Sequence, residues 1–194
     1  YASMVRLMDA CAEYNRKMLI LDRPNPNGHY VDGPILDMKY KSSVGWLPIP
    51  IVHGMTLGEL ALMVNGERWL PASRICDITV IKCKNYTHQT MYELPIPPSP
   101  NLPNMKAVYL YPSTCYFEAT PVSLGRGTQL PFQIYGHPNM LGYDYTFTPQ
   151  SIPGAKNPPQ LNRICHGVNL SELSNEEIWK KGVDLSYLID AYRN

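Results

Sequence analysis

The stretch FEATPVSLGRGTQLPFQIYGHP holds the densest set of groups that could do chemistry. Glu118 follows two aromatic residues, and Arg126 is a permanent cation between two glycines. A carboxylate, a guanidinium and neighbouring hydroxyls such as that of Thr120 suit a polar ligand with an acidic group. A structural reading is equally open, in which Arg126 forms an ion pair with Glu118 or Asp32.

A second group of polar residues follows the apolar run at residues 18–21, in the stretch LDRPNPNG. Its prolines restrict φ and fix the shape of the loop, so Asp22, Arg23 and Asn25 can face a ligand with little loss of loop entropy. Alternatively, the Asp and Asn side chains bond their own backbone and make a structural turn. The next polar stretch, VDGP, predicts a turn that carries Asp32.

Three more polar residues lie at predicted helix ends and loops. His53 comes just before a helix predicted from the T-x-x-E capping box of Thr56 and Glu59, and helix N-termini favour anionic or polar groups. His53 therefore either binds substrate or is a histidine without a ligand, hydrogen-bonded in the core or simply exposed. Ser99 and Asn101 interrupt the proline-rich stretch LPIPPSPNLPNM, which reads either as an extended linker or as a rigid loop over a cleft.

Helix and strand patterns indicate that an α/β domain carries these residues. Apolar side chains between residues 4 and 12, Leu7 among them, fall on one face of a predicted helix. The apolar run at residues 18–21 predicts a strand buried on both faces of a mostly parallel sheet, and residues 75–81 predict another strand. Ligands of open α/β sheets lie at the carboxyl ends of strands, where the loop after residue 21 begins.

Composition narrows the class of protein. The 194 residues are 44% apolar with a net charge of +1, so the chain can bury a core and lacks the field typical of nucleic-acid or anionic-membrane binders. No apolar run reaches the roughly 20 residues of a membrane helix, and no signal-peptide pattern opens the chain. The five cysteines have no metal-ligand spacing, and no phosphate-binding loop is present. We predict no metal and no nucleotide cofactor.

Together, the stretches LDRPNPNG, VDGP, PIPIVHGMTLGELA, PSPNLP and FEATPVSLGRGTQLPFQIYGHP resemble exo-β-N-acetylmuramidases of the NamZ type, in the family's order. The resemblance implies that residues 1–138 are the C-terminal part of a Rossmann-like catalytic domain. Residues 139–194 would begin a smaller α/β domain. It also implies release of terminal N-acetylmuramic acid from peptidoglycan fragments, outside the cytoplasm and without a cofactor.

The chain also departs from the family pattern. Members commonly read E-G-T-N and then S-E-G-R-G-T, whereas this chain has EATP at Glu118 and a leucine, Leu124, in place of the second acid. Members are also longer, and their upstream half carries a P-E-H-G motif whose Glu is a candidate catalytic acid. The resemblance therefore predicts that part of the active site lies outside this chain, and that a companion segment completes the N-terminal domain.

Glycoside cleavage usually needs two carboxyl groups across the scissile bond. Glu118 is the catalytic carboxyl predicted here, and Arg23 and Arg126 are expected to pair with the lactyl carboxylate of muramic acid. The predicted substrate-binding residues are Asp22, Arg23, Asn25, Asp32, His53, Ser99, Asn101, Thr120 and Arg126. The alternative is a non-catalytic muropeptide- or sugar-binding protein of the same fold, which would lack an acidic motif opposite Glu118.

Overall fold

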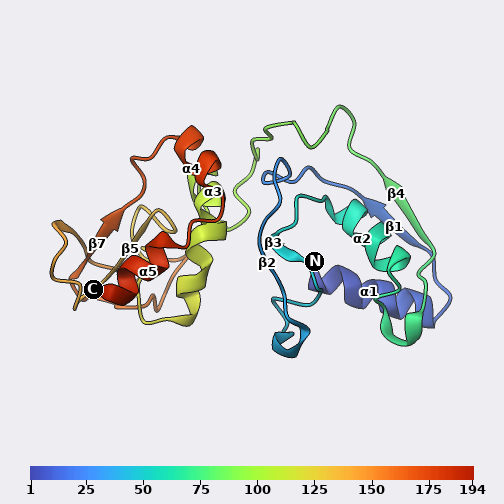
Figure 1. The fold of residues 1–194 in the computed structure, drawn as a ribbon, viewed down its shortest axis with the longest axis horizontal. Helices are drawn as coiled ribbons and strands as arrows, with labels where there is room; N and C mark the ends of the chain where they lie inside the picture. The colour runs from blue at the N-terminus through green and yellow to red at the C-terminus, as the bar shows by residue number, and fades with distance from the viewer. The chain divides into compact units, whose positions relative to one another are not determined.

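The computed structural model describes residues 1–194, and their contacts divide the chain into two compact units, Tyr1–Tyr92 and Glu93–Asn194 (Figure 1). Each unit has its own hydrophobic core. The first unit contains α1 (Ala2–Glu13), β1 (Met18–Leu21), β2 (Asp32–Ile35), η1 (Met38–Tyr40), β3 (Pro50–Val52), α2 (Leu57–Gly66), η2 (Pro71–Ser73) and β4 (Ile78–Ile81). The α/β fold class predicted from the sequence is confirmed.

A two-stranded parallel sheet organises the first unit. β1 and β4 pair in register, from Met18 opposite Ile78 to Leu21 opposite Ile81. Helix α2 lies between them in the chain, as expected for a parallel crossover. Side chains of α1, α2 and both strands share one core, whose buried members include Val5, Met8, Ile20, Leu60, Ala61 and Val64. Both parallel strands end at the same edge, so the loops that follow them are neighbours.

The other face of this sheet is bare and apolar. Leu19 and Leu21 of β1 are 60% and 70% exposed, and Ile81 of β4 is 52% exposed. Successive strand residues point to opposite faces, so these three share the face away from the core. The prediction that the first strand is buried on both faces is therefore wrong for this chain. On α1, four residues of the predicted apolar face, Met4, Met8, Cys11 and Ala12, belong to the core, whereas Leu7 is 54% exposed and Val5 is buried in addition.

A short antiparallel pair, β2 with β3, lies in the same unit. The sequence predicts a turn around Asp32, whereas Asp32 begins β2 and pairs with Val52. Gly33 has a φ of +86°, and a Cβ there would lie 2.4 Å from the Ile51 side chain, so glycine is required. The register between the two strands is irregular between Asp32 and Ile35, and a turn-like sequence is accommodated inside a strand.

The second unit contains α3 (Met105–Thr114), η3 (Cys115–Ala119), β5 (Ile134–His137), β6 (Tyr145–Phe147), β7 (Cys165–Asn169), α4 (Asn175–Lys181) and α5 (Ser186–Arg193). Its sheet is antiparallel, with β7 between β5 and β6. The main core is formed largely by α3, η3, β5, α4 and α5, and it includes Leu110, Phe117, Phe132, Tyr135, Ile178 and Tyr187. None of the helices is both long and apolar enough to cross a membrane.

The contacts divide the chain at Tyr92–Glu93, whereas the sequence predicts a domain boundary after residue 138. Strand β5 explains the difference, because it pairs with β7 and so belongs to the second unit. The proline-rich stretch that begins at residue 94 lies next to the contact boundary. The stretch after it is the helix α3, which the Asn104 side chain caps by accepting from the Ala107 amide.

Candidate functional site

Asp22 follows β1 and joins the end of that strand to the start of α2. Its carboxylate accepts hydrogen bonds from the Thr56 hydroxyl at 2.6 Å and from the Gly58 amide at 2.9 Å. Thr56 and Glu59 form the reciprocal capping box predicted from the sequence. A Cβ on Gly58 would lie 2.8 Å from the Asp22 carboxyl group, so glycine allows the close approach. Because helix N-termini favour negative charge, Asp22 stabilises α2.

We expect Asp22→Ala to lower the free energy of unfolding by about 0.5–2 kcal/mol, because the N-terminal turn of α2 loses a side-chain acceptor. Urea unfolding monitored by circular dichroism measures this change. Asp77→Ala is the matched control, because the Asp77 side chain is 64% exposed and its contact with Lys17 is 3.9 Å long. Equal stabilities of the two variants would argue against the role of Asp22 at the helix end.

The loop after β1 is held by its own polar groups and by Tyr86. The Asn25 side chain donates to the Met55 carbonyl at 2.9 Å and accepts from the Asn27 amide at 2.9 Å. The Tyr86 hydroxyl accepts from the Asn25 amide and donates to the Asn25 carbonyl, at 3.2 and 3.1 Å. These bonds support the structural reading for Asn25. The Arg23 side chain, in contrast, is exposed and remains accessible to a ligand.

Asp32 and His53 also make local hydrogen bonds. The Asp32 carboxylate accepts from the Gly33 amide at 2.7 Å. The Nδ1 atom of His53 accepts from the Met55 amide at 3.1 Å, and burial lowers the pKa of His53. The neutral ring therefore carries its proton on Nε2, which is the atom available to donate to a ligand.

A pocket borders these loops at the carboxyl edge of the parallel strands. It is lined by Asp22, Thr56, Glu59, Leu62, Val80, Lys82, Cys83 and Tyr86. Of the predicted site residues in this unit, only Asp22 lines it. Thr56, Glu59 and Tyr86 are polar lining residues that the sequence analysis did not assign to a ligand site. Their hydrogen bonds to the surrounding loops give the pocket a fixed shape.

His88 joins three segments beside this pocket and was not singled out from the sequence. Its Nδ1 lies 3.0 Å from the Gly28 carbonyl and its Nε2 lies 3.1 Å from the Glu59 carboxylate. Both partners are acceptors, so only the doubly protonated ring can donate to both. These two contacts, led by the one to Gly28, raise the pKa of His88.

This raised pKa predicts a pH dependence of stability. The stabilisation by His88 is complete below the unfolded-state pKa of about 6.5 and is lost as the pH rises through the higher pKa of the folded state. We therefore expect the stability difference between the parent protein and His88→Gln to shrink as the pH is raised through that window. Urea unfolding at a series of pH values measures it, and parallel stability curves would contradict the prediction.

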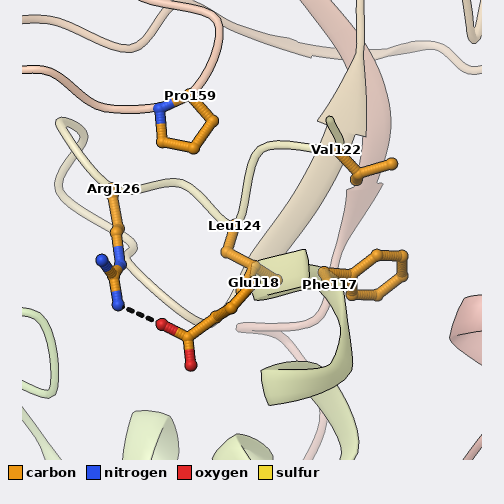
Figure 2. Close-up of a pocket in the computed structure, with 6 residues that line it drawn as sticks. All are labelled: Phe117, Glu118, Val122, Leu124, Arg126 and Pro159. Atoms are coloured by element: carbon orange, nitrogen blue, oxygen red, sulfur yellow. Dashed lines mark hydrogen bonds and ion pairs between the residues drawn. The ribbon is translucent and has the colours of Figure 1, made fainter. Parts of the chain in front are cut away.

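In the second unit, the structure brings Glu118 and Arg126 together (Figure 2). The Arg126 guanidinium donates to one oxygen of the Glu118 carboxylate, and both side chains are a little over one third exposed. Glu118 is on η3, directly after α3, and Arg126 is on the following loop. The pocket around the pair is lined by Phe117, Glu118, Val122, Leu124, Arg126 and Pro159. Within the second unit this is the Glu118–Arg126 ion pair that the sequence left open as a structural alternative.

Two glycines with positive φ hold the Arg126 backbone. Gly125 has a φ of +72° and Gly127 a φ of +82°. A Cβ on Gly125 would lie 2.7 Å from the Leu130 carbonyl, and one on Gly127 would lie 2.3 Å from the Gln150 carbonyl. Both positions therefore require glycine, which gives the Gly-Arg-Gly triplet a structural cause. The tight turn fixes where the Arg126 side chain starts.

Two aromatic residues that were not assigned from the sequence, Tyr111 and Phe132, also interact with this ion pair. The Tyr111 hydroxyl donates to the second oxygen of Glu118 at 3.4 Å, and burial together with the Glu118 charge raises the Tyr111 pKa to about 12. The Arg126 guanidinium lies 5.2 Å from the centre of the Phe132 ring. Tyr111 precedes Glu118 by two helical turns. This spacing would have predicted their contact only if α3 had been recognised as a helix.

One donor in this pocket has no partner. The Nε of Arg126 is buried and makes no hydrogen bond, although its guanidinium already pairs with Glu118. An unsatisfied buried donor costs about 1–3 kcal/mol, and an acidic ligand that supplied an oxygen would remove this cost. Leu124 is 3% exposed and contributes an apolar wall at the position where the family commonly has an acid.

The other predicted polar residues of the second unit shape its loops. The Thr120 hydroxyl donates to the Phe117 carbonyl at 2.8 Å, and the Ser99 hydroxyl accepts from the Asn101 amide at 3.2 Å. The Asn101 side chain donates to the Gly154 carbonyl at 3.2 Å. The rigid-loop reading of the proline-rich stretch is supported by these bonds. No group of three or more His, Cys, Asp or Glu side chains is arranged to hold a metal ion.

Comparison with known families gives two matches that follow each other along the chain. The model of the N-terminal domain of the exo-β-N-acetylmuramidase NamZ matches residues 1–106. The model of the NamZ C-terminal domain matches residues 109–193. The two models therefore meet inside α3, near the division seen in the contacts.

Individual relatives agree with these matches. The chain is 38% identical over 184 residues to the peptidoglycan β-N-acetylmuramidase NamZ of Bacillus subtilis strain 168, a match that spans 87% of this chain and 44% of that protein. A crystal structure of a DUF1343 family protein from Bacteroides fragilis is 86% identical, with a TM-score of 0.98, and the match covers all of this chain and 55% of that one. A second one is 27% identical, with a TM-score of 0.73 and 56% of its chain covered. The chain thus spans about half of these relatives.

Proposed function

This chain belongs to the NamZ family of exo-β-N-acetylmuramidases, and on that premise we propose that the whole protein is a glycosidase that releases terminal N-acetylmuramic acid from peptidoglycan fragments. The observation that carries the proposal is the Glu118–Arg126 pair, which lines a pocket in the second unit. A carboxylate for chemistry and a guanidinium for an acidic sugar are the two groups that the reaction on muramic acid needs.

Arg126 is the residue proposed to recognise the substrate. Muramic acid differs from glucosamine by a lactyl group that ends in a carboxylate, and a guanidinium binds a carboxylate through two parallel hydrogen bonds. The unpartnered Nε of Arg126 supports this role, because a ligand oxygen would satisfy it. Arg23, exposed at the end of β1, is proposed as a second contact for the substrate.

Glu118 is proposed to act as an ionised carboxylate. Arg126 and Tyr111 direct donors at its two oxygens, which is the pattern that a carboxylate satisfies and a protonated acid does not. That role is a nucleophile, a base that activates water, or a group that stabilises positive charge on the sugar. The acid that protonates the leaving oxygen would then come from residues outside this chain, and the upstream P-E-H-G glutamate of the family is our candidate.

We propose that a companion segment covers the bare face of the β1–β4 sheet. Leu19, Leu21 and Ile81 expose apolar side chains on that face. Parallel sheets are normally covered on both faces, and the family relatives are about twice as long as the part that this chain matches. We also propose an extracytoplasmic, periplasmic or secreted location and a role in cell-wall recycling, since intact peptidoglycan lies outside the cytoplasm.

A second candidate function is binding without catalysis. Leu124 replaces an acid of the family pattern and leaves an apolar wall in the pocket. A protein that recognised muropeptides would need Arg126 and the pocket but not a second carboxyl group. The two candidates make different predictions about turnover.

Hydrolysis of a chromogenic β-N-acetylmuramide by the whole protein separates these candidates. The proposed function predicts saturable turnover that exceeds turnover of the matching β-N-acetylglucosaminide. Calorimetric titration with N-acetylmuramic acid runs in parallel as the binding measurement. Saturable binding without any turnover would replace the glycosidase with the binding protein, and neither binding nor turnover would remove both.

A further inference from the structure

A second pocket, here called the Trp46 pocket, lies in the first unit. It is lined by Val5, Arg6 and Asp9 of α1, by Lys41 and Trp46 from the segment before β3, and by Trp69 and Pro71 after α2. None of these residues lines the pocket beside Asp22. Both tryptophans are partly exposed and also pack against the core of the unit, so their rings are firmly held.

Two positive charges converge on this pocket without an acidic partner. The guanidinium carbon of Arg6 lies 4.7 Å, and the ammonium nitrogen of Lys41 lies 4.2 Å, from the centre of the Trp46 ring. Neither cation forms an ion pair with a carboxylate. Both cations therefore lie against the Trp46 ring and line the same pocket, which gives this pocket a positive charge that would favour an anionic ligand.

The acidic residue of the pocket is already neutralised. Asp9 accepts two hydrogen bonds from Arg74, from its Nη2 at 2.7 Å and from its Nε at 3.1 Å. Such a pairing leaves little negative charge to attract Arg6 or Lys41. The net charge that the pocket offers to a ligand is therefore positive.

We propose that the Trp46 pocket binds an acidic sugar, with Arg6 and Lys41 on its carboxylate and the apolar surface of Trp69 and Pro71 against the ring. The proposal rests on the proposed function, because a glycan strand freed of its stem peptides carries lactyl carboxylates at intervals and so offers acidic sugars beyond the one that is cleaved. Aromatic surface beside a few convergent polar groups is the usual lining of a ligand pocket. The pocket would thus hold a muramic acid residue away from the Glu118–Arg126 pair.

The first test compares three probes in calorimetric titrations of the whole protein, read out at the pocket by the indole NMR signals of Trp46 and Trp69. N-acetylmuramic acid carries both the ring and the carboxylate, N-acetylglucosamine only the ring, and lactate only the carboxylate. We expect N-acetylmuramic acid to bind about tenfold more tightly than either simpler probe and to shift both signals. Equal binding of lactate would mean a plain anion site and would overturn the proposal.

The second test uses matched variants. Arg6→Gln with Lys41→Gln is expected to reduce N-acetylmuramic acid binding at Trp46 to the level of N-acetylglucosamine. Arg16→Gln with Lys84→Gln is the control, because both residues are exposed and no ion pair involves them. Unchanged binding in the first double variant, or an equal loss in the control, would overturn the proposal.

Turnover keeps the two claims separate. Hydrolysis of the chromogenic muramide by the parent protein tests the proposed function, whereas the indole signals test the pocket. Absence of turnover with shifts at Trp46 would reject the glycosidase and retain the acidic-sugar site. Turnover without any shift at Trp46 and Trp69 would retain the glycosidase and reject the site.

Discussion

Glu118→Gln in the whole protein is expected to lower kcat for muramide hydrolysis by about 10²–10⁴-fold, while the protein stays folded and still binds the sugar. Glutamine keeps the shape of the side chain but cannot act as an anionic nucleophile or base. It also loses the charge that pairs with Arg126, whereas the Tyr111 hydroxyl can still donate to its remaining carbonyl oxygen. Steady-state kinetics with the chromogenic muramide, together with thermal unfolding, provide the measurement.

The matched control for this variant is Glu176→Gln, an exposed glutamate in the first turn of α4. It changes the net charge by the same amount, and Glu176 does not line the pocket. The control should keep the activity of the parent protein. Near-normal turnover by Glu118→Gln would remove this carboxylate from the mechanism and leave the chemistry to acids outside this chain.

Arg126→Lys is expected to lower kcat/KM for a muramide about tenfold more than for the matching glucosaminide. Lysine keeps the positive charge beside Glu118 but loses the planar fork, including the unpartnered Nε that we assign to the lactyl carboxylate. Each factor of ten corresponds to about 1.4 kcal/mol of transition-state stabilisation, the size of one charge-assisted hydrogen bond. Kinetics on both substrates with one enzyme preparation measure the ratio.

Arg163→Lys is the control for this substitution, since Arg163 is exposed and donates to Gln160. This control should change kcat/KM for neither substrate. If Arg126→Lys lowered turnover of both substrates by the same factor, Arg126 would act through its ion pair with Glu118 and not through recognition of the lactyl group. That result would leave the open structural reading of this arginine as the better one.

Local signals in the sequence predicted the helix ends and strands that depend on interactions between residues close in the chain. The Thr56–Glu59 capping box is present, because two side chains three residues apart satisfy each other's backbone donors wherever that helix begins. The apolar run at Met18–Leu21 is a strand and pairs with the strand ending at Ile81. Its exposure was predicted incorrectly, because burial depends on what covers a face and not on the strand's own residues.

The site was harder to predict, because hydrogen-bond partners come from distant segments. Asp22 looked available in the sequence, yet its acceptors are occupied by Thr56 and Gly58 from another element. His88 carried no motif and is placed by contacts with Gly28 and Glu59. Arg126 was the exception, since it was singled out from the sequence and it lines a pocket, held between two glycines of positive φ.

The most direct test of the central claim is product analysis on defined glycan fragments with the whole protein. Two fragments of equal length are compared, one with N-acetylmuramic acid and one with N-acetylglucosamine at the non-reducing end. We predict that mass spectrometry will detect free N-acetylmuramic acid from the first fragment and no cleavage of the second. Release of disaccharides, or equal cleavage of both fragments, would contradict an exo-acting β-N-acetylmuramidase.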